Sequence, residues 1–122
     1  MESETPKYIL LIDDDKDLLQ LLELRLLREG YKVKTLWNGA NMMDSFIEAK
    51  PDLVLMDINM PLVSGNALCK VIKQNASTEK IPVILLSGNE NVEKISSSCG
   101  ADGYILKPVE PTLLSKQIKS YL

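Results

Sequence analysis

The sequence contains no histidine and only two cysteines, Cys69 and Cys99, which lie far apart and outside any Cys-x-x-Cys pair. The absence of imidazole excludes acid–base catalysis by histidine and most zinc sites. We interpret both cysteines as small buried apolar residues rather than as a disulfide or a metal site. Oxygen atoms therefore remain as the main candidates for holding any metal ion.

Long apolar runs and an excess of positive charge are also missing. No apolar stretch approaches the roughly 18 to 20 residues that span a bilayer, and residues 1–6 are polar and acidic, unlike a signal peptide. We therefore expect a cytoplasmic protein with no membrane association. The net charge is −3, and 12 lysines with 2 arginines form no basic stripe, so direct nucleic-acid binding is not expected.

The rest of the composition is that of one ordinary folded domain. The chain has 122 residues, of which 45% are hydrophobic and 25% charged, so it can build one core but has no room for a second. We expect residues 1–6 to form an N-terminal tail and residues 7–122 to form the domain. No internal repeat, low-complexity tract or linker interrupts it.

Short apolar runs alternate with amphipathic segments, and turn residues separate them. The runs predict buried strands at 8–12 and 53–56 and further strands at 31–36, 82–86 and 103–106. Helices are predicted at 17–28, between Asn38-Gly39 and Pro51, after the N-cap candidate Ser64, at 91–99 and at 111–121. The second helix would bury Met42, Met43, Phe46 and Ile47, and the third would bury Leu68, Val71 and Ile72. Five strand–helix units in succession indicate an α/β fold, a five-stranded parallel sheet with helices on both faces.

In such a sheet the binding crevice lies beyond the carboxyl ends of the strands, where the winding direction reverses. Polar residues follow four of the predicted strands: Asp13, Asp14 and Asp15 after the first, Asp57 after the third, Ser87 after the fourth, and Lys107-Pro108 after the fifth. Each of them alone is an ordinary cap, turn or strand end. Crowded carboxylates repel one another unless a cation is held among them, and an oxygen-only site suits Mg²⁺. We interpret Asp15 and Asp17 only as charges in the first helical turn.

The sequence resembles a response-regulator receiver domain, the phosphoacceptor module of two-component signalling. The resemblance is carried, in order and over nearly the whole chain, by residues 9–15 (ILLIDDD), 51–61 (PDLVLMDINMP) with Gly65, 82–87 (PVILLS) and 100–108 (GADGYILKP). It implies the flavodoxin-like (βα)5 fold with strand order 2-1-3-4-5, so that residues 7–122 would be the receiver domain.

The resemblance also implies roles for individual residues. Asp57 would accept the phosphoryl group, with Lys107 and Ser87 contacting its oxygens. Mg²⁺ would be held by Asp14 and Asp57, by the backbone carbonyl of Asn59, and by Asp13 through water. Ser87 and Tyr104 would form the switch, and the Lys107-Pro108 bond would be cis. Phosphoryl transfer needs in-line positioning and charge neutralisation more than covalent machinery, and a carboxylate is an accepted nucleophile for it.

The function that this implies is a phosphorylation-dependent switch rather than a conventional enzyme. It would take phosphate from a sensor histidine kinase or a histidine phosphotransfer protein, would assist its own phosphorylation and dephosphorylation, and would act on an unknown output partner. The sequence leaves open a dimer that depends on phosphorylation, and it leaves open whether the receiver stands alone or belongs to a longer protein.

Three positions depart from the family pattern. Ser64 replaces the usual Asp, and Gly88 follows Ser87 where Ala is commoner. Trp37, the only tryptophan, occupies a position after the second strand that is usually polar. We hypothesise that Trp37 contacts a partner, with a half-buried packing role as the alternative.

Other functions fit less well. Asp13-Asp14-Asp15 superficially satisfies the Asp-x-Asp motif of a class of phosphatases, but that class expects Thr or Val where this chain has Asp17, and a cap and acidic pair for which there is no room. A flavodoxin is disfavoured because a row of aspartates would repel the flavin phosphate. A pseudo-receiver, an interaction module without phosphorylation, remains the alternative, although every active-site position is present.

Overall fold

The computed structural model describes residues 5–38, 50–60 and 63–122. Within them, five strands form one parallel sheet in the order β2-β1-β3-β4-β5, which confirms the expected order. Their bounds are β1 (Tyr8–Ile12), β2 (Lys32–Leu36), β3 (Leu53–Asp57), β4 (Val83–Ser87) and β5 (Gly103–Leu106). Each strand lies within about one residue of its predicted position. The three inner strands are buried on both faces, as their continuous apolar runs predict, whereas the edge strands β2 and β5 are only partly buried.

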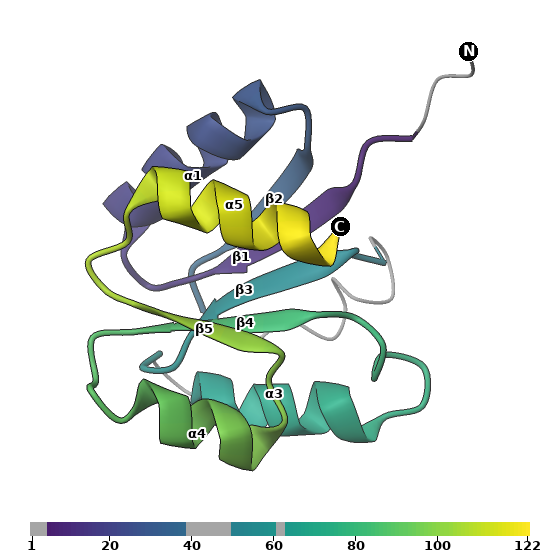
Figure 1. Cartoon of the computed structure of the whole chain (residues 1–122), viewed down its shortest axis with the longest axis vertical. Coiled ribbons are helices and arrows are strands. Elements are labelled where there is room, and N and C mark those ends of the chain that lie inside the picture. The colour runs from purple at the N-terminus through teal and green to yellow at the C-terminus, as the bar shows by residue number, and fades with distance from the viewer. Residues whose placement is uncertain (1–4, 39–49, 61–62) are drawn as a thin grey trace.

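Helices cover both faces of the sheet. The described helices are α1 (Lys16–Arg28), α3 (Gly65–Gln74), α4 (Val92–Cys99) and α5 (Pro111–Tyr121). Figure 1 shows α1 and α5 on one face and α3 and α4 on the other. The predicted helix containing Met42, Met43, Phe46 and Ile47 lies outside the described residues. No described helix is long and apolar enough to cross a membrane.

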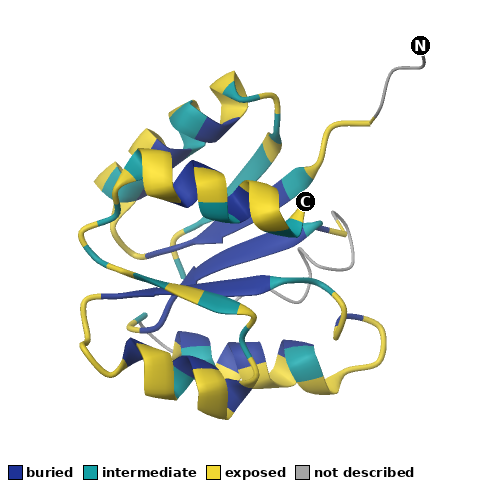
Figure 2. Cartoon of the chain, viewed as in Figure 1, coloured by how far each residue is buried: buried dark blue, intermediate teal, exposed yellow. Residues whose placement is uncertain are grey.

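Alternate residues of the inner strands pack into two separate cores, one on each side of the sheet. Leu10, Ile12, Val54 and Met56 face α3 and α4, whereas the intervening residues of β1 and β3 face α1 and α5. Both cores are almost completely buried (Figure 2). This two-sided burial holds β1 and β3 rigidly at the centre of the molecule.

The helix ends follow local sequence signals. Asp15 is the N-cap of α1 and accepts a hydrogen bond from Leu18 N, so it has a more specific role than the first-turn charge we expected. Gly30 and Gly100, after α1 and α4, adopt left-handed backbone angles (φ 96° and 81°). Ser64 is the N-cap residue of α3, but its side chain makes no capping hydrogen bond.

One buried position was predicted wrongly. Val71 on α3 is 49% exposed, while Leu68, Cys69 and Ile72 form the buried face of that helix. Helical spacing allowed the buried face that contains Leu68 and Ile72 to include either Val71 or Cys69. The actual rotation places Cys69, between α3 and α4, in the core instead.

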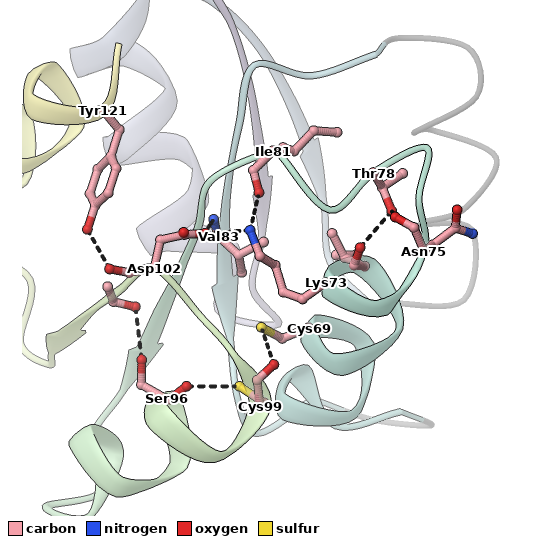
Figure 3. Close-up of polar contacts among 12 residues, drawn as sticks. Cys69, Lys73, Asn75, Thr78, Ile81, Val83, Ser96, Cys99, Asp102 and Tyr121 are labelled. Carbon is pink, nitrogen blue, oxygen red and sulfur yellow. Dashed lines mark hydrogen bonds and ion pairs between the residues drawn. The ribbon is translucent and has the colours of Figure 1, made fainter.

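The two cysteines are buried, as expected, and lie at the contact between α3 and α4. The Cys69 thiol lies 3.6 Å from the carbonyl oxygen of Cys99 (Figure 3). Burial raises the pKa of the Cys69 thiol. Both residues therefore act as small apolar side chains in this core.

Candidate functional site

The predicted site residues meet at the carboxyl edge of the sheet, beside the point where its winding reverses. β1 and β3 are neighbours there, Asp13 directly follows β1, and Asp57 ends β3. The backbone ladder continues past the strands, because Asp13 N donates to Leu36 O and Ile58 N donates to Leu86 O, both at 3.0 Å. Asp13 and Asp57 are therefore fixed by the sheet itself rather than by a free loop.

Three carboxylates and one ammonium group form the centre of the site. Asp13, Asp14 and Asp57 each place a carboxylate oxygen within 4.8 Å of the other two. Lys107 Nζ lies 2.8 Å from Asp13 Oδ2 and 3.6 Å from Asp57 Oδ1. Asp13 and Asp57 are almost completely buried, whereas Asp14 is exposed. The lysine thus partly balances two acids that have little access to water.

The raised pKa of Asp57 shows that Lys107 does not fully offset the burial of this carboxylate and the negative charge beside it. Burial, followed by the charge of Asp13, raises the pKa of Asp57 to about 6, and Asp14 adds to this effect. Lys107 and a long hydrogen bond from Asn59 N (3.4 Å to Oδ1) act in the opposite direction. The pKa of Lys107 is raised because its pairing with Asp13 and Asp57 outweighs the opposing effect of burial. One more positive charge would stabilise the ionised cluster.

The donor set fits a hard divalent cation. Asp13 Oδ2 is shielded from solvent and has no assigned hydrogen-bond partner among the described residues, although Lys107 Nζ forms an ion pair with it at 2.8 Å. Asp13 Oδ1 accepts from Asp15 N at 2.9 Å, which orients the carboxylate. Asp14 and Asn59 are exposed beside this pair, where water can complete a coordination shell. The acidic cluster is therefore chemically suited to Mg²⁺.

Gly65 allows α3 to begin directly beside Asp57. A Cβ atom at this position would collide with the backbone of Asp57 and would lie 2.9 Å from Ile58 Cα. Gly65 N also donates to Ile58 O at 2.7 Å. Any larger residue would displace the segment that carries Asp57 and Asn59, so this glycine is a positioning residue of the site.

Ser87 and Tyr104, the predicted switch residues, lie on the neighbouring strands β4 and β5. The Ser87 hydroxyl is fully buried and accepts a hydrogen bond from Asn89 N at 3.0 Å. Tyr104 is 38% exposed, and its hydroxyl donates to Glu93 Oε2 on α4 at 3.1 Å. The Lys107-Pro108 bond is cis, as expected. The structure thus brings together Asp13, Asp14, Asp57, Asn59 and Lys107, while the two predicted switch residues have hydrogen-bond partners outside this group.

Sequence reasoning missed two residues that link separate elements of the fold. Glu93, on α4, holds the Tyr104 hydroxyl, and nothing in its local sequence indicates this role. Asp102 lies at the opposite edge of the sheet, where its carboxylate accepts from Val83 N and Lys73 Nζ, both at 2.8 Å (Figure 3). Its carbonyl accepts from Tyr121 on α5 at 2.6 Å. Asp102 was noticed only as part of a family motif.

The chain closely resembles known receiver domains. A family model described as "Response regulator receiver domain" matches residues 9–119. The transcriptional regulatory protein AfsQ1 of Streptomyces coelicolor is 34% identical over 116 residues, which cover 93% of this chain and 50% of that protein. The chain spans about half the length of the curated relatives that it matches.

Solved structures of response regulators have the same fold as this chain. A putative response regulator from Chloroflexus aurantiacus has a TM-score of 0.91 and 29% identity, with coverage of 96% of this chain and 98% of that one. The response regulator TrrA of Thermotoga maritima, solved in complex with Mg²⁺ and BeF, has a TM-score of 0.85 and 32% identity, with coverage of 95% and 99%.

Proposed function

This chain belongs to the response regulator receiver domain family, a family of signalling modules, and from this premise we propose that it is a phosphorylation switch whose phosphoacceptor is Asp57. The observation that carries the proposal is the Asp13–Asp14–Asp57 cluster with Lys107 ion-paired across two of its members. The unphosphorylated interaction module, the alternative, is not favoured, because a chain without phosphoryl transfer would not need Asp13, Asp14, Asp57 and Lys107 to lie together.

The chemistry proposed for Asp57 is an in-line displacement. One oxygen of its carboxylate attacks the phosphorus of a phosphohistidine, the new O–P bond forms as the N–P bond breaks, and the imidazole leaves with the electron pair and takes up a proton. The fold holds the nucleophile at the end of a buried strand. Lys107, 3.6 Å from Asp57, is placed to neutralise charge on the transferred group.

Asp14 and Asp57, the carbonyl oxygen of Asn59, and Asp13 through water would hold Mg²⁺. When bound, the metal supplies positive charge that offsets the carboxylates and the incoming phosphoryl oxygens. Asp13 also orients Lys107 through the 2.8 Å ion pair. The same residues would assist hydrolysis of the aspartyl phosphate by a water in line with the O–P bond.

Phosphorylation would be transmitted through Ser87 and Tyr104. The phosphoryl group offers Ser87 a charged acceptor that competes with the contact between its hydroxyl and Asn89 N. Movement of that hydroxyl frees space beside β4, into which Tyr104 turns, which breaks its hydrogen bond to Glu93. The surface of α4, β5 and α5 therefore changes. A sensor histidine kinase or histidine phosphotransfer protein would be the donor in the cytoplasm, and the output partner would bind the changed surface, in a phosphorylation-dependent dimer or otherwise.

The experiment that tests this proposal is intact-mass spectrometry after incubation with acetyl phosphate. The wild type should gain one phosphoryl group when Mg²⁺ is present and should gain none in EDTA. The Asp57→Asn variant should remain unlabelled, since the amide cannot act as the nucleophile. Asp52→Asn is the matched control, because Asp52 lies beyond the opposite end of β3 and should leave labelling intact. Equal labelling of wild type and Asp57→Asn would contradict the assignment.

A further inference from the structure

The two ends of α4 are held in different ways, and the first turn is held loosely. A hydrogen bond from the Tyr104 hydroxyl to Glu93 joins this turn to β5 at the exposed surface. Asn91, the N-cap residue, makes no side-chain capping bond, and residues 88–91 are all exposed. Val92 is buried here, but an apolar contact has no preferred direction and permits a tilt. Among the described residues, directional contacts thus hold this end of α4 far less than they hold its C-terminal end.

The C-terminal end of α4 packs directly against α3. The Cys69 thiol on α3 lies 3.6 Å from the carbonyl oxygen of Cys99, the last residue of α4 (Figure 3). A Cβ atom at Gly100, the next residue, would lie 3.5 Å from Lys73 Cβ on α3, which is ordinary van der Waals contact. Displacement of this end would therefore separate the two helices and open a buried contact.

Asp102, in the turn between α4 and β5, connects this end to α3 and to β4. Its carboxylate accepts hydrogen bonds from Val83 N, at the start of β4, and from Lys73 Nζ, both at 2.8 Å (Figure 3). Lys73 Nζ also donates to Ile81 O at 3.0 Å, and its side chain is only 15% exposed. Asp102 N donates to Val83 O at 2.9 Å. Because hydrogen bonds between charged groups are stronger than neutral ones, Asp102 holds the turn firmly in place.

We propose that Asp102 is the fixed point about which α4 turns, so that the switch tilts the first turn of the helix and leaves Cys99 packed against α3. The inference rests on the proposed function of Asp57 and specifies how its switch moves. A tilt about a fixed end breaks fewer contacts than displacement of the whole helix. A partner would therefore detect the switch at the first turn of α4 rather than at its serine-rich last turn.

The buried thiols provide a natural report on whether the C-terminal end of α4 opens. N-Ethylmaleimide alkylates thiols that solvent can reach, and peptide mass spectrometry separates Cys99 from Cys69. In the wild type, beryllofluoride with Mg²⁺ should change the alkylation rate of Cys99 by no more than about twofold, because the contact with α3 stays closed. In the same sample, the amide NMR signals of Glu93 and Tyr104 should shift.

Asp102→Ala removes the fixed point. Beryllofluoride should then draw the whole helix away from α3 and raise the alkylation rate of Cys99 by about fivefold or more over the unliganded variant. The ratio between the two states is the readout, because a simple loss of stability raises both rates alike. Lys73→Met, which keeps the hydrogen bond from Val83 N, should raise the ratio less.

Asp52→Ala is the matched control. Like Asp102, Asp52 directly precedes a strand, and its carboxylate accepts a hydrogen bond from the first residue of a neighbouring strand, Tyr8 N, at 2.8 Å. This contact joins β3 to β1 rather than α4 to its neighbours. The alkylation ratio of Cys99 in Asp52→Ala should therefore equal that of the wild type.

An unchanged ratio in Asp102→Ala would overturn the inference, as would an equal rise in Asp52→Ala. A wild-type Cys99 that beryllofluoride makes accessible would overturn it too. Urea unfolding verifies that each variant folds, and if Asp102→Ala does not, an unchanged ratio in Lys73→Met would overturn the inference. If beryllofluoride shifts neither Glu93 nor Tyr104 in the wild type, the switch of the proposed function fails, and the inference fails with it.

Discussion

The Asp57 carboxylate is costly to ionise in this fold. The pKa of the side chain rises from its ordinary value of 3.8 to about 6, because the group is buried and faces Asp13. The folded protein therefore holds the Asp57 proton more tightly than the unfolded chain does. As the pH rises from about 4 through 6, ionisation of Asp57 removes stability from the metal-free native state, and the loss is complete above that range.

We predict that Asp57→Asn stabilises the metal-free protein at neutral pH. The amide has nearly the same shape and carries no charge, so the free energy of unfolding in EDTA at pH 7.5 should increase by on the order of 1 to 3 kcal/mol. The gain should shrink toward pH 4.5, where the wild-type carboxyl keeps most of its proton. Urea unfolding followed by circular dichroism at both pH values measures the difference.

Asp17→Asn provides the comparison, because Asp17 is an exposed carboxylate in the first turn of α1. It should change stability little, and without the pH dependence expected at Asp57. An Asp57→Asn gain of equal size at pH 4.5 and 7.5 would mean that charge on Asp57 is not its source.

At the scale of elements, α4 is the described helix best placed to move. It has only eight residues, of which three in succession are serine, and it is tied to β5 through the Tyr104–Glu93 hydrogen bond. Small side chains bury little apolar area, so displacement of the helix costs little. The hydrogen bond to Glu93 stabilises the outward position of Tyr104, in which the ring is 38% exposed.

We predict that beryllofluoride with Mg²⁺, a mimic of the phosphoryl group, shifts the amide NMR signals of residues 91–99 and of Tyr104. Tyr104→Phe removes the hydroxyl that holds the ring outward, so the unliganded variant should already show these signals displaced toward their beryllofluoride positions, with the inward population raised roughly twofold or more.

Tyr121→Phe is the corresponding control, since the Tyr121 hydroxyl, at the end of α5, donates to Asp102 O just before β5 and makes no hydrogen bond to α4. It should leave the signals of α4 near their wild-type positions. Shifts confined to the neighbourhood of Asp57 in the wild type would refute the switch and would leave the phosphoacceptor role intact.

At the scale of the whole molecule, metal binding should be visible as global stability. Asp13 and Asp14 follow β1 and Asp57 ends β3, so the three carboxylates are close only when the sheet is formed. A cation that binds the folded state alone stabilises it by about 2.7 kcal/mol at a concentration 100 times the Kd. Global unfolding thus reports on a site that occupies only one edge of the protein.

We predict that Mg²⁺ raises the midpoint of thermal unfolding in a saturable manner. The gain should be lost in Asp14→Ala, because the variant lacks a proposed metal ligand. The variant should still fold, because the exposed Asp14 side chain can be truncated without opening a cavity in the core. Differential scanning calorimetry in Mg²⁺ and in NaCl of matched ionic strength separates binding from charge screening. An equal rise in both salts would show that the cluster does not hold the ion specifically.

Much of the fold could be predicted from the residues because local patterns carry it. Continuous apolar runs located the three inner strands to within about one residue, β-rich composition located β2 equally well, and helical spacing located α1 and α5. The positions after the strands identified Asp13, Asp57 and Lys107 before any distance was known, because parallel strands end at one edge. These inferences need only the neighbours of a residue along the chain, together with the rule for where parallel sheets bind ligands.

Other features were decided only by the tertiary structure. Whether Lys107 pairs with Asp13 or with Asp57 depends on side chains from strands far apart in sequence, and the structure places it closer to Asp13. The inward turn of Cys69 in place of Val71, and the bond between Tyr104 and Glu93, depend likewise on how α3 and α4 rotate against the sheet.

For Trp37 too, the position along the chain was predictable from the sequence, whereas its exposure was decided by the tertiary structure. Its place after β2 could be read from the chain, but a tryptophan is equally suited to a core and to an interface. In the structure Trp37 is 56% exposed, its ring lies 5.1 Å from Lys16 Nζ, and both residues line an open depression at the surface. The physical reason is general: periodicity determines which way a residue points relative to its own element, whereas burial and pairing depend on what the other elements bring to that side.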